Sequence, residues 1–216
     1  MADKLNKMTD LEQIQHYIAC KQEDDFATKN IKYEWLLDHM ETKYTKKKYR
    51  DYVVNYLLIN YCCRNNDVDC LMLTKNDYVG CNAEKENFLV VMDDATIQWV
   101  RCDYKTNKTL DALTYVIRDE KFIHSVNELM KDSNFLFNNG ADERIDRRSI
   151  GRVIANATYN HLGQQSYFNI IRKHYKNDAE KLLQIAHSRP VALRSVVYWC
   201  GNYHRFIENY WIHWIS

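Results

Sequence analysis

A change in hydrophobic periodicity near the middle of the chain most constrains its fold. Residues 49–60 place apolar side chains at intervals of three and four, the spacing of one helix face. Residues 96–103 and 111–118 instead alternate apolar and polar side chains, which predicts two half-buried strands around a turn at residues 104–109. Helical spacing returns after the second strand. The sequence therefore predicts helices, then a small antiparallel sheet, then helices again.

The length of the chain limits its domain organisation. With 216 residues, 46% of them hydrophobic, the chain can bury one sizeable core and carry a short helical arm. The segment before the first predicted core helix has helical spacing at residues 8–18 and 31–40, followed by a basic run. We therefore predict an N-terminal helical arm at residues 1–45, a main domain at residues 46–200, and a C-terminal aromatic helix or tail at residues 201–216.

Hydropathy and cysteine usage indicate an intracellular protein. The longest apolar runs fall well short of the roughly 20 residues that a membrane span needs, and no secretory signal opens the chain, so we expect no membrane partner. An odd number of cysteines, seven, predicts reduced thiols in the cytoplasm or nucleus. Zinc is the alternative, but Cys62, Cys63, Cys70 and Cys81 lack the CxxC spacing, so burial is favoured.

The balance of charges limits how this chain could bind nucleic acid. Lys and Arg total 30 against 29 acids, so no global basic field exists and any DNA contact must come from a local patch. One such patch combines basic residues with Tyr44 and Tyr49, and a solvated helix start explains it equally well. The predicted DNA-binding residues are Lys46, Lys47, Lys48, Arg50 and, in a later helix, Lys173.

Two segments resemble the first half of the catalytic domain shared by tyrosine recombinases and type IB topoisomerases. Arg64-Asn65-Asn66-Asp67 resembles the first box of the family, where an acid follows an arginine by three residues. The resemblance implies that Arg64 is the first catalytic arginine and Asp67 its supporting acid. The predicted strand-turn-strand is similar to the hairpin that presents the catalytic lysine, which would be Lys105, with Lys108 as the alternative.

Two later segments complete the resemblance. The run from Asn169 to His174 is similar to the second box, so that Arg172 matches the second catalytic arginine. Asn169 stands where the family usually carries a histidine. Ala186-His187-Ser188 resembles the small-residue, histidine, serine motif, and Tyr198 follows as the nucleophile. The resemblance thus implies an α+β fold that is mainly α, with a three-stranded antiparallel sheet at one edge, and DNA as the partner.

The chemistry of strand transfer requires these residue types together. Attack of a tyrosine hydroxyl on a phosphodiester builds negative charge that two arginines hold through forked hydrogen bonds. A lysine would protonate the leaving sugar oxygen, and the phosphotyrosine keeps the energy of the broken bond for rejoining. We therefore expect no metal and no cofactor.

Two functions from different classes remain open. The first is a compact tyrosine recombinase or integrase that cleaves and rejoins DNA. The second is a catalytically inactive descendant reused as a structural or DNA-binding component, for example a minor capsid or virion protein of a large DNA virus. The neutral charge, the short arm and Asn169 favour the second function, and the five matching residues favour the first. The Lys-, Asn-, Ile- and Tyr-rich composition is typical of an AT-rich genome, which fits a large DNA virus or an AT-rich microbe.

An aromatic stripe near the C-terminus predicts a protein partner. Its side chains recur at intervals of three and four, which puts them on one helix face that must be covered. We expect self-association or contact with another protein through this face, and packing onto the chain's own core is the alternative. The stripe comprises Tyr203, Phe206, Ile207, Tyr210, Trp211, Trp214 and Ile215.

Overall fold

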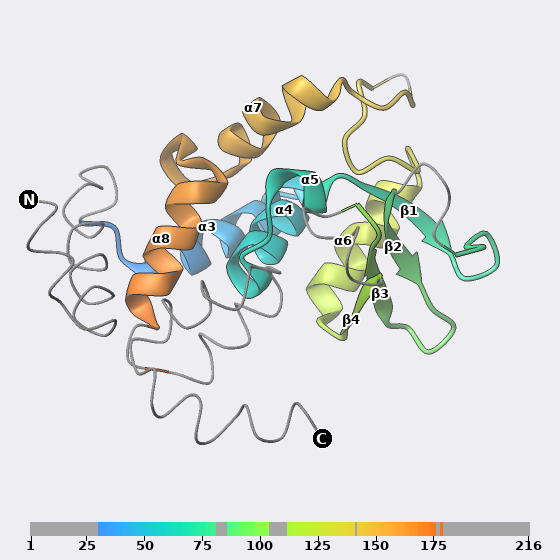
Figure 1. Cartoon of the computed structure of the whole chain (residues 1–216), viewed down its shortest axis with the longest axis horizontal. Coiled ribbons are helices and arrows are strands. Elements are labelled where there is room, and N and C mark those ends of the chain that lie inside the picture. Colours follow the sequence, from blue (N-terminus) through green and yellow to red (C-terminus); the bar gives the residue numbers. More distant parts are fainter. Residues whose placement is uncertain (1–29, 81–85, 104–111, 141, 176–177, 179–216) are drawn as a thin grey trace, which may run out of the picture.

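The computed structural model describes residues 30–80, 86–103, 112–140, 142–175 and 178 (Figure 1). This part of the chain combines helices with one sheet, as the change of periodicity predicted. The helix predicted at residues 8–18 and the C-terminal stripe lie outside the described residues. In chain order the elements are α3 (Tyr33–Thr45), α4 (Tyr49–Tyr61), α5 (Asn65–Val68), β1 (Cys70–Thr74), β2 (Asn87–Val91), β3 (Ile97–Arg101), β4 (Leu113–Ile117), α6 (Glu120–Met130), α7 (Arg147–Ala157), the 3₁₀ turn η1 (Tyr159–His161) and α8 (Gly163–His174).

The sheet has four strands in the order β1-β2-β3-β4, and it is mixed. β3 and β4 are the two predicted strands, and they pair antiparallel, which confirms that part of the prediction. The predicted three-stranded antiparallel sheet is wrong, because β1 is a fourth strand that pairs parallel with β2. β2 reads Asn-Phe-Leu-Val-Val, a nearly continuous apolar run, so this strand lacks the alternation of apolar and polar residues that revealed β3 and β4.

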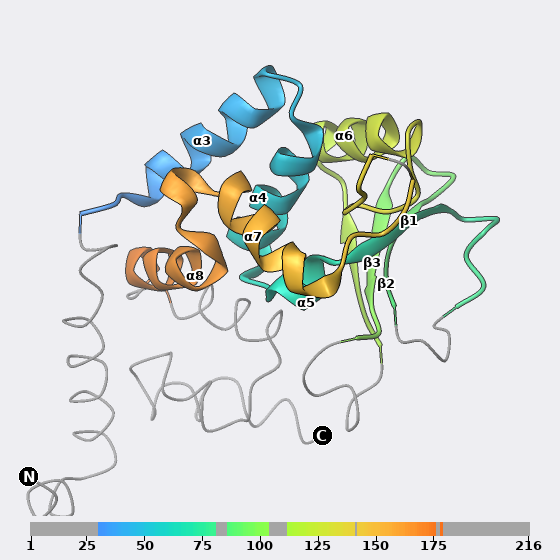
Figure 2. The ribbon, with the colours of Figure 1, turned by 90° about the horizontal axis from the view of Figure 1, so that it is seen from above.

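The main core lies between the helices and one face of the sheet. Figure 2 shows α3 and α8 at one end of the described part of the chain, the sheet at the other, and α4 and α7 between them. Val53 and Leu57 of α4 are fully buried, and Leu36 and Met40 of α3 belong to the same buried cluster. Residues on both sides of the predicted boundary at residue 45 therefore share one core. The other face of the sheet buries a smaller cluster around Phe88.

The cysteines differ in chemical state. Cys62, Cys63 and Cys70 are buried free thiols, and burial raises the pKa of Cys63 and of Cys70 above the ordinary value for a thiol. Cys102, next to the end of β3, is disulfide-bonded. The expectation that all thiols are reduced is therefore wrong for Cys102. Disulfide formation depends on which cysteines approach in space, and spacing along the chain does not reveal this.

None of the helices in the described part of the chain is both long and apolar enough to cross a membrane.

His39 predicts a pH dependence of stability. Its Nε2 lies 3.0 Å from the carbonyl oxygen of Ala157, which links α3 to the end of α7. Burial lowers the pKa of His39 below its ordinary value of 6.5, nearby Lys43 and, less strongly, His161 lower it further, and Asp51 raises it. The hydrogen bond to Ala157 acts in the opposite direction. The unfolded chain therefore binds this proton more readily than the folded protein does.

The neutral imidazole thus contributes stability that is fully present above the unfolded pKa of 6.5 and is lost as the pH falls through the lower folded pKa. We expect the melting temperature to fall more steeply as the pH drops below 6.5 in the wild type than in His39→Gln. The glutamine amide can still donate to Ala157 but does not titrate. Equal slopes in thermal melts across this range would contradict the assignment.

Candidate functional site

Arg64 occupies the N-cap position of α5, immediately after the helix α4 and the cysteine pair. Its backbone N–H donates to Oδ2 of Asp67 at 2.7 Å, and the N–H of Asp67 donates back to the carbonyl oxygen of Arg64 at 3.0 Å. A carboxylate at the third helical position satisfies an N–H that the short helix leaves unpaired. The two predicted residues are therefore brought together, through the backbone of Arg64.

The carboxylate of Asp67 forms its ion pair with a residue that the sequence analysis missed. Nη2 of Arg101 lies 2.7 Å from Oδ2 of Asp67, and the two side chains are 0% and 1% exposed. The missed signal was the strand period, because Ile97, Trp99 and Arg101 share one face of β3 and the first two are apolar. That pattern directs the guanidinium of Arg101 into the core.

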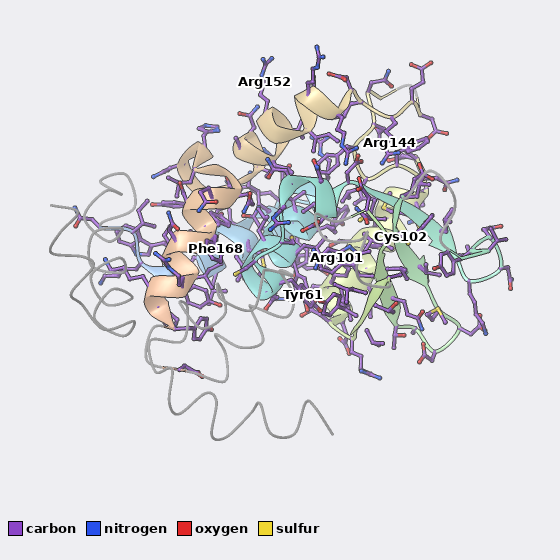
Figure 3. The ribbon with its side chains drawn as sticks, in the orientation of Figure 1. Tyr61, Arg101, Cys102, Arg144, Arg152 and Phe168 are labelled. Atoms are coloured by element: carbon purple, nitrogen blue, oxygen red, sulfur yellow. The ribbon has the colours of Figure 1, made fainter. Side chains whose placement is uncertain are left out.

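Aromatic rings surround the guanidinium of Arg101, in the region marked by Arg101 and Tyr61 in Figure 3. Its central carbon lies 4.9 Å from the ring centroid of Trp99, and the hydroxyl oxygen of Tyr115 accepts a hydrogen bond from it. Burial raises the pKa of Tyr115, and the nearby guanidinium partly offsets this effect. The ring of Tyr61 lies 5.2 Å from those of Trp99 and Tyr115. The arginine is thus held by a carboxylate, a phenol and an indole.

Asn87, a buried residue at the start of β2, joins α5 to the end of β3. Its Nδ2 donates to the carbonyl oxygen of Asn66 at 2.9 Å, and its Oδ1 accepts from the backbone N–H of Asp103 at 2.9 Å. Asp103 is the last described residue before the segment that contains the predicted lysines. Lys105 and Lys108 themselves lie outside the described residues.

A polar pocket of about 220 Å³ opens beside Asn87, where β2 begins and β3 ends. Arg144, labelled in Figure 3, spans two carboxylates there, with Nη2 2.9 Å from Asp69 and Nη1 2.8 Å from Glu86. Arg147, at the start of α7, pairs with Asp103. Within the described ranges, no group of His, Cys, Asp and Glu could hold a metal ion. The pocket is lined by Asn66, Asp69, Glu86, Asn87, Asp103, Arg144, Ile145 and Arg147.

The second predicted box lies on α8. Arg172 is in its last turn, with its guanidinium 5.9 Å from the ring centroid of Phe168. Oδ1 of Asn169 accepts a hydrogen bond from Gln165 at 3.4 Å. In both Figure 1 and Figure 2 the last turn of α8 lies farther from α5 than its first turn does. The predicted His187 and Tyr198 lie outside the described residues.

The predicted DNA-binding residues fall at two places. Lys46, Lys47 and Lys48 form an exposed turn between α3 and α4, and Arg50 follows in α4 with Nε 4.0 Å from Asp51. Lys173 is exposed near the end of α8.

These two places lie at opposite ends of α3. At its first residue, Tyr33 stacks on His174 of α8 with ring centroids 4.3 Å apart, whereas the lysine turn follows its last residue. A helix of 13 residues is roughly 20 Å long, so Lys173 and the lysine turn do not form one compact patch.

The arrangement around α5 can support chemistry on an anion. Arg64 offers a forked, permanently charged donor group from a position that is fixed by Asp67 and Arg101, next to the end of β3. The ion pair between Asp67 and Arg101 is buried, so water does not compete with it, and this favours a constant geometry at the start of α5. No family model matches the chain, and no curated protein or solved structure matches it either.

Proposed function

We propose that this protein cleaves and rejoins DNA strands through a phosphotyrosine intermediate, in the manner of tyrosine recombinases. In this proposal Tyr198 attacks the phosphodiester, Arg64 and Arg172 hold its oxygens, Lys105 protonates the leaving sugar oxygen, and His187 assists. The observation that carries the proposal is the side chain of Asn87, which hydrogen-bonds both to α5 and to the end of β3.

The bridge matters because it brings together two segments that the proposed reaction needs close to each other. Arg64 precedes Asn66 by two residues, and Lys105 follows Asp103 by two residues. Two residues of chain span at most about 7 Å, which is comparable to the length of an arginine or lysine side chain. These chain lengths would allow the guanidinium of Arg64 and the ammonium of Lys105 to reach one phosphate group.

The two groups would have complementary roles. The guanidinium holds negative charge on the non-bridging oxygens in the transition state, where preorganised donors contribute most. The ammonium gives a proton to the leaving oxygen, and a positioned proton donor accelerates such reactions by roughly 10²- to 10⁴-fold. The tyrosine ester then keeps the phosphate activated until a free 5′-hydroxyl replaces the protein.

A second candidate function is binding or structural assembly without cleavage, for example in a viral particle. The placement of Arg172 favours it, because the last turn of α8 lies away from α5 in both views (Figures 1 and 2). A phosphate held by Arg64 would then lack the second arginine, and the fold would serve to bind rather than to react.

Adduct formation separates the two candidates. We expect the wild type to form a covalent adduct, seen on a denaturing gel, with a nicked DNA duplex that traps the intermediate. Tyr198→Phe should abolish the adduct completely and leave DNA affinity unchanged, because it removes only the attacking hydroxyl. Tyr78→Phe, on the far side of the sheet, is the matched control and should behave as the wild type does. A wild type that binds DNA but never forms the adduct would favour the second candidate.

A further inference from the structure

The buried ion pair between Arg101 and Asp67 is more than a core contact. We infer that Arg101 is a positioning residue for Arg64, acting through Asp67, and that it sets the rate of strand cleavage without touching DNA. The inference rests on the proposed function, and it identifies the residue that orients the anion-binding group of that site.

A single oxygen atom connects the two arginines. Oδ2 of Asp67 lies 2.7 Å from Nη2 of Arg101 in a buried ion pair, and the same oxygen accepts a hydrogen bond from the backbone N–H of Arg64 at 2.7 Å. Any movement of the guanidinium of Arg101 therefore shifts the carboxylate that fixes the backbone of Arg64. A displacement of about 1 Å in a catalytic group can cost about 10²-fold in rate.

The surroundings of Arg101 make it a rigid anchor. Its side chain is 0% exposed, lies over Trp99 at 4.9 Å and donates to the hydroxyl of Tyr115. A buried ion pair is seldom the most stable way to fill a core, because apolar side chains of similar volume often serve as well or better. Retention of a charged pair here is consistent with a requirement for orientation.

The backbone of Arg101 takes part in the second half of the site. It pairs with Asn87 of β2 and with Leu113 of β4, and it is the last residue of β3 before the segment with the predicted lysines. Arg101 therefore orients Arg64 through its side chain, and its backbone lies at the end of β3, just before the segment that contains Lys105 and Lys108. Removal of the side-chain charge alone tests the first of these two roles.

The test is single-turnover cleavage of the nicked duplex by the double variant Asp67→Asn/Arg101→Met. Both buried charges are removed together, and the asparagine oxygen can still accept from the N–H of Arg64. We expect the cleavage rate to fall about 10- to 100-fold, with the melting temperature and DNA affinity close to those of the wild type. The control Glu41→Gln/Lys121→Met removes an exposed pair between α3 and α6 and should leave the rate unchanged.

A second background distinguishes positioning from general damage to the fold. Because Arg101 acts through Arg64, the same double substitution should cause no further loss of rate in an Arg64→Ala protein. An equal fall in both backgrounds would overturn the inference. Should the double variant fail to fold, Arg101→Lys, which keeps one donor for Asp67, should show a smaller fall and the same lack of additivity.

The remaining outcomes separate the inference from the proposed function. A double variant that cleaves at the wild-type rate would overturn the positioning role and leave the proposed function standing. A wild type without any adduct would overturn both.

Discussion

Arg101→Met should lower the free energy of unfolding by about 3–5 kcal/mol, the usual cost of leaving one partner of a buried ion pair alone. The carboxylate of Asp67 is 1% exposed, and its Oδ1 has no hydrogen-bond partner within the described residues. Loss of the guanidinium would leave that charge in a medium where water cannot solvate it. Urea denaturation followed by far-UV circular dichroism measures the change.

Two variants show whether the loss comes from the unpaired charge. Asp67→Asn/Arg101→Met should recover most of the stability, because no charge remains buried. Arg148→Met, at an exposed position of α7, should stay within about 0.5 kcal/mol of the wild type. A double variant as unstable as the single variant would mean that packing around the long side chain, rather than charge pairing, holds this part of the core together.

Trp99→Ala should also lower the free energy of unfolding by about 3–5 kcal/mol, the range for large aromatic side chains in cores. Trp99 is one of the largest fully buried side chains of the described residues, and its ring packs against those of Tyr61 and Tyr115 at centroid distances of 5.2 Å and 5.6 Å. Its removal opens a cavity below Arg101 that the surrounding strands cannot close fully.

Trp35→Ala is the matched control, because it removes the same side chain from a site that is 41% exposed. We expect a loss below about 1 kcal/mol there. Chemical denaturation of both variants, with the slope of the transition compared as well, gives the measurement. Similar losses at the two positions would contradict the view that Trp99 anchors the core between α4 and the sheet.

These two residues show how the candidate site depends on the core. Trp99 supports Arg101, Arg101 holds Asp67, and Asp67 fixes the start of α5 where Arg64 stands. The site therefore inherits the rigidity of a largely buried strand, although Arg64 itself is half-buried at the surface. Damage to the core at Trp99 is expected to reach the site through this chain of contacts.

The sequence by itself determined the elements whose signals are local. The helical spacing of residues 49–60 predicted α4, its return after the second predicted strand indicated α6, and alternation predicted β3 and β4. Each of these patterns follows from the repeat of a single helix or strand, which is a property of adjacent residues. The pairing of Arg64 with Asp67 across three residues is local in the same way.

Only the tertiary structure decided which distant residues meet. The parallel pairing of β1 with β2, the bridge from Asn87 to Asn66 and Asp103, and the pair between Asp67 and Arg101 all join residues that lie far apart in the chain. No local sequence pattern predicts these long-range contacts, because they follow from the packing of complete elements onto a shared core. The roles of Lys105, His187 and Tyr198 stay predictions of the sequence, while the place of Arg64 beside a buried arginine is the contribution of the fold.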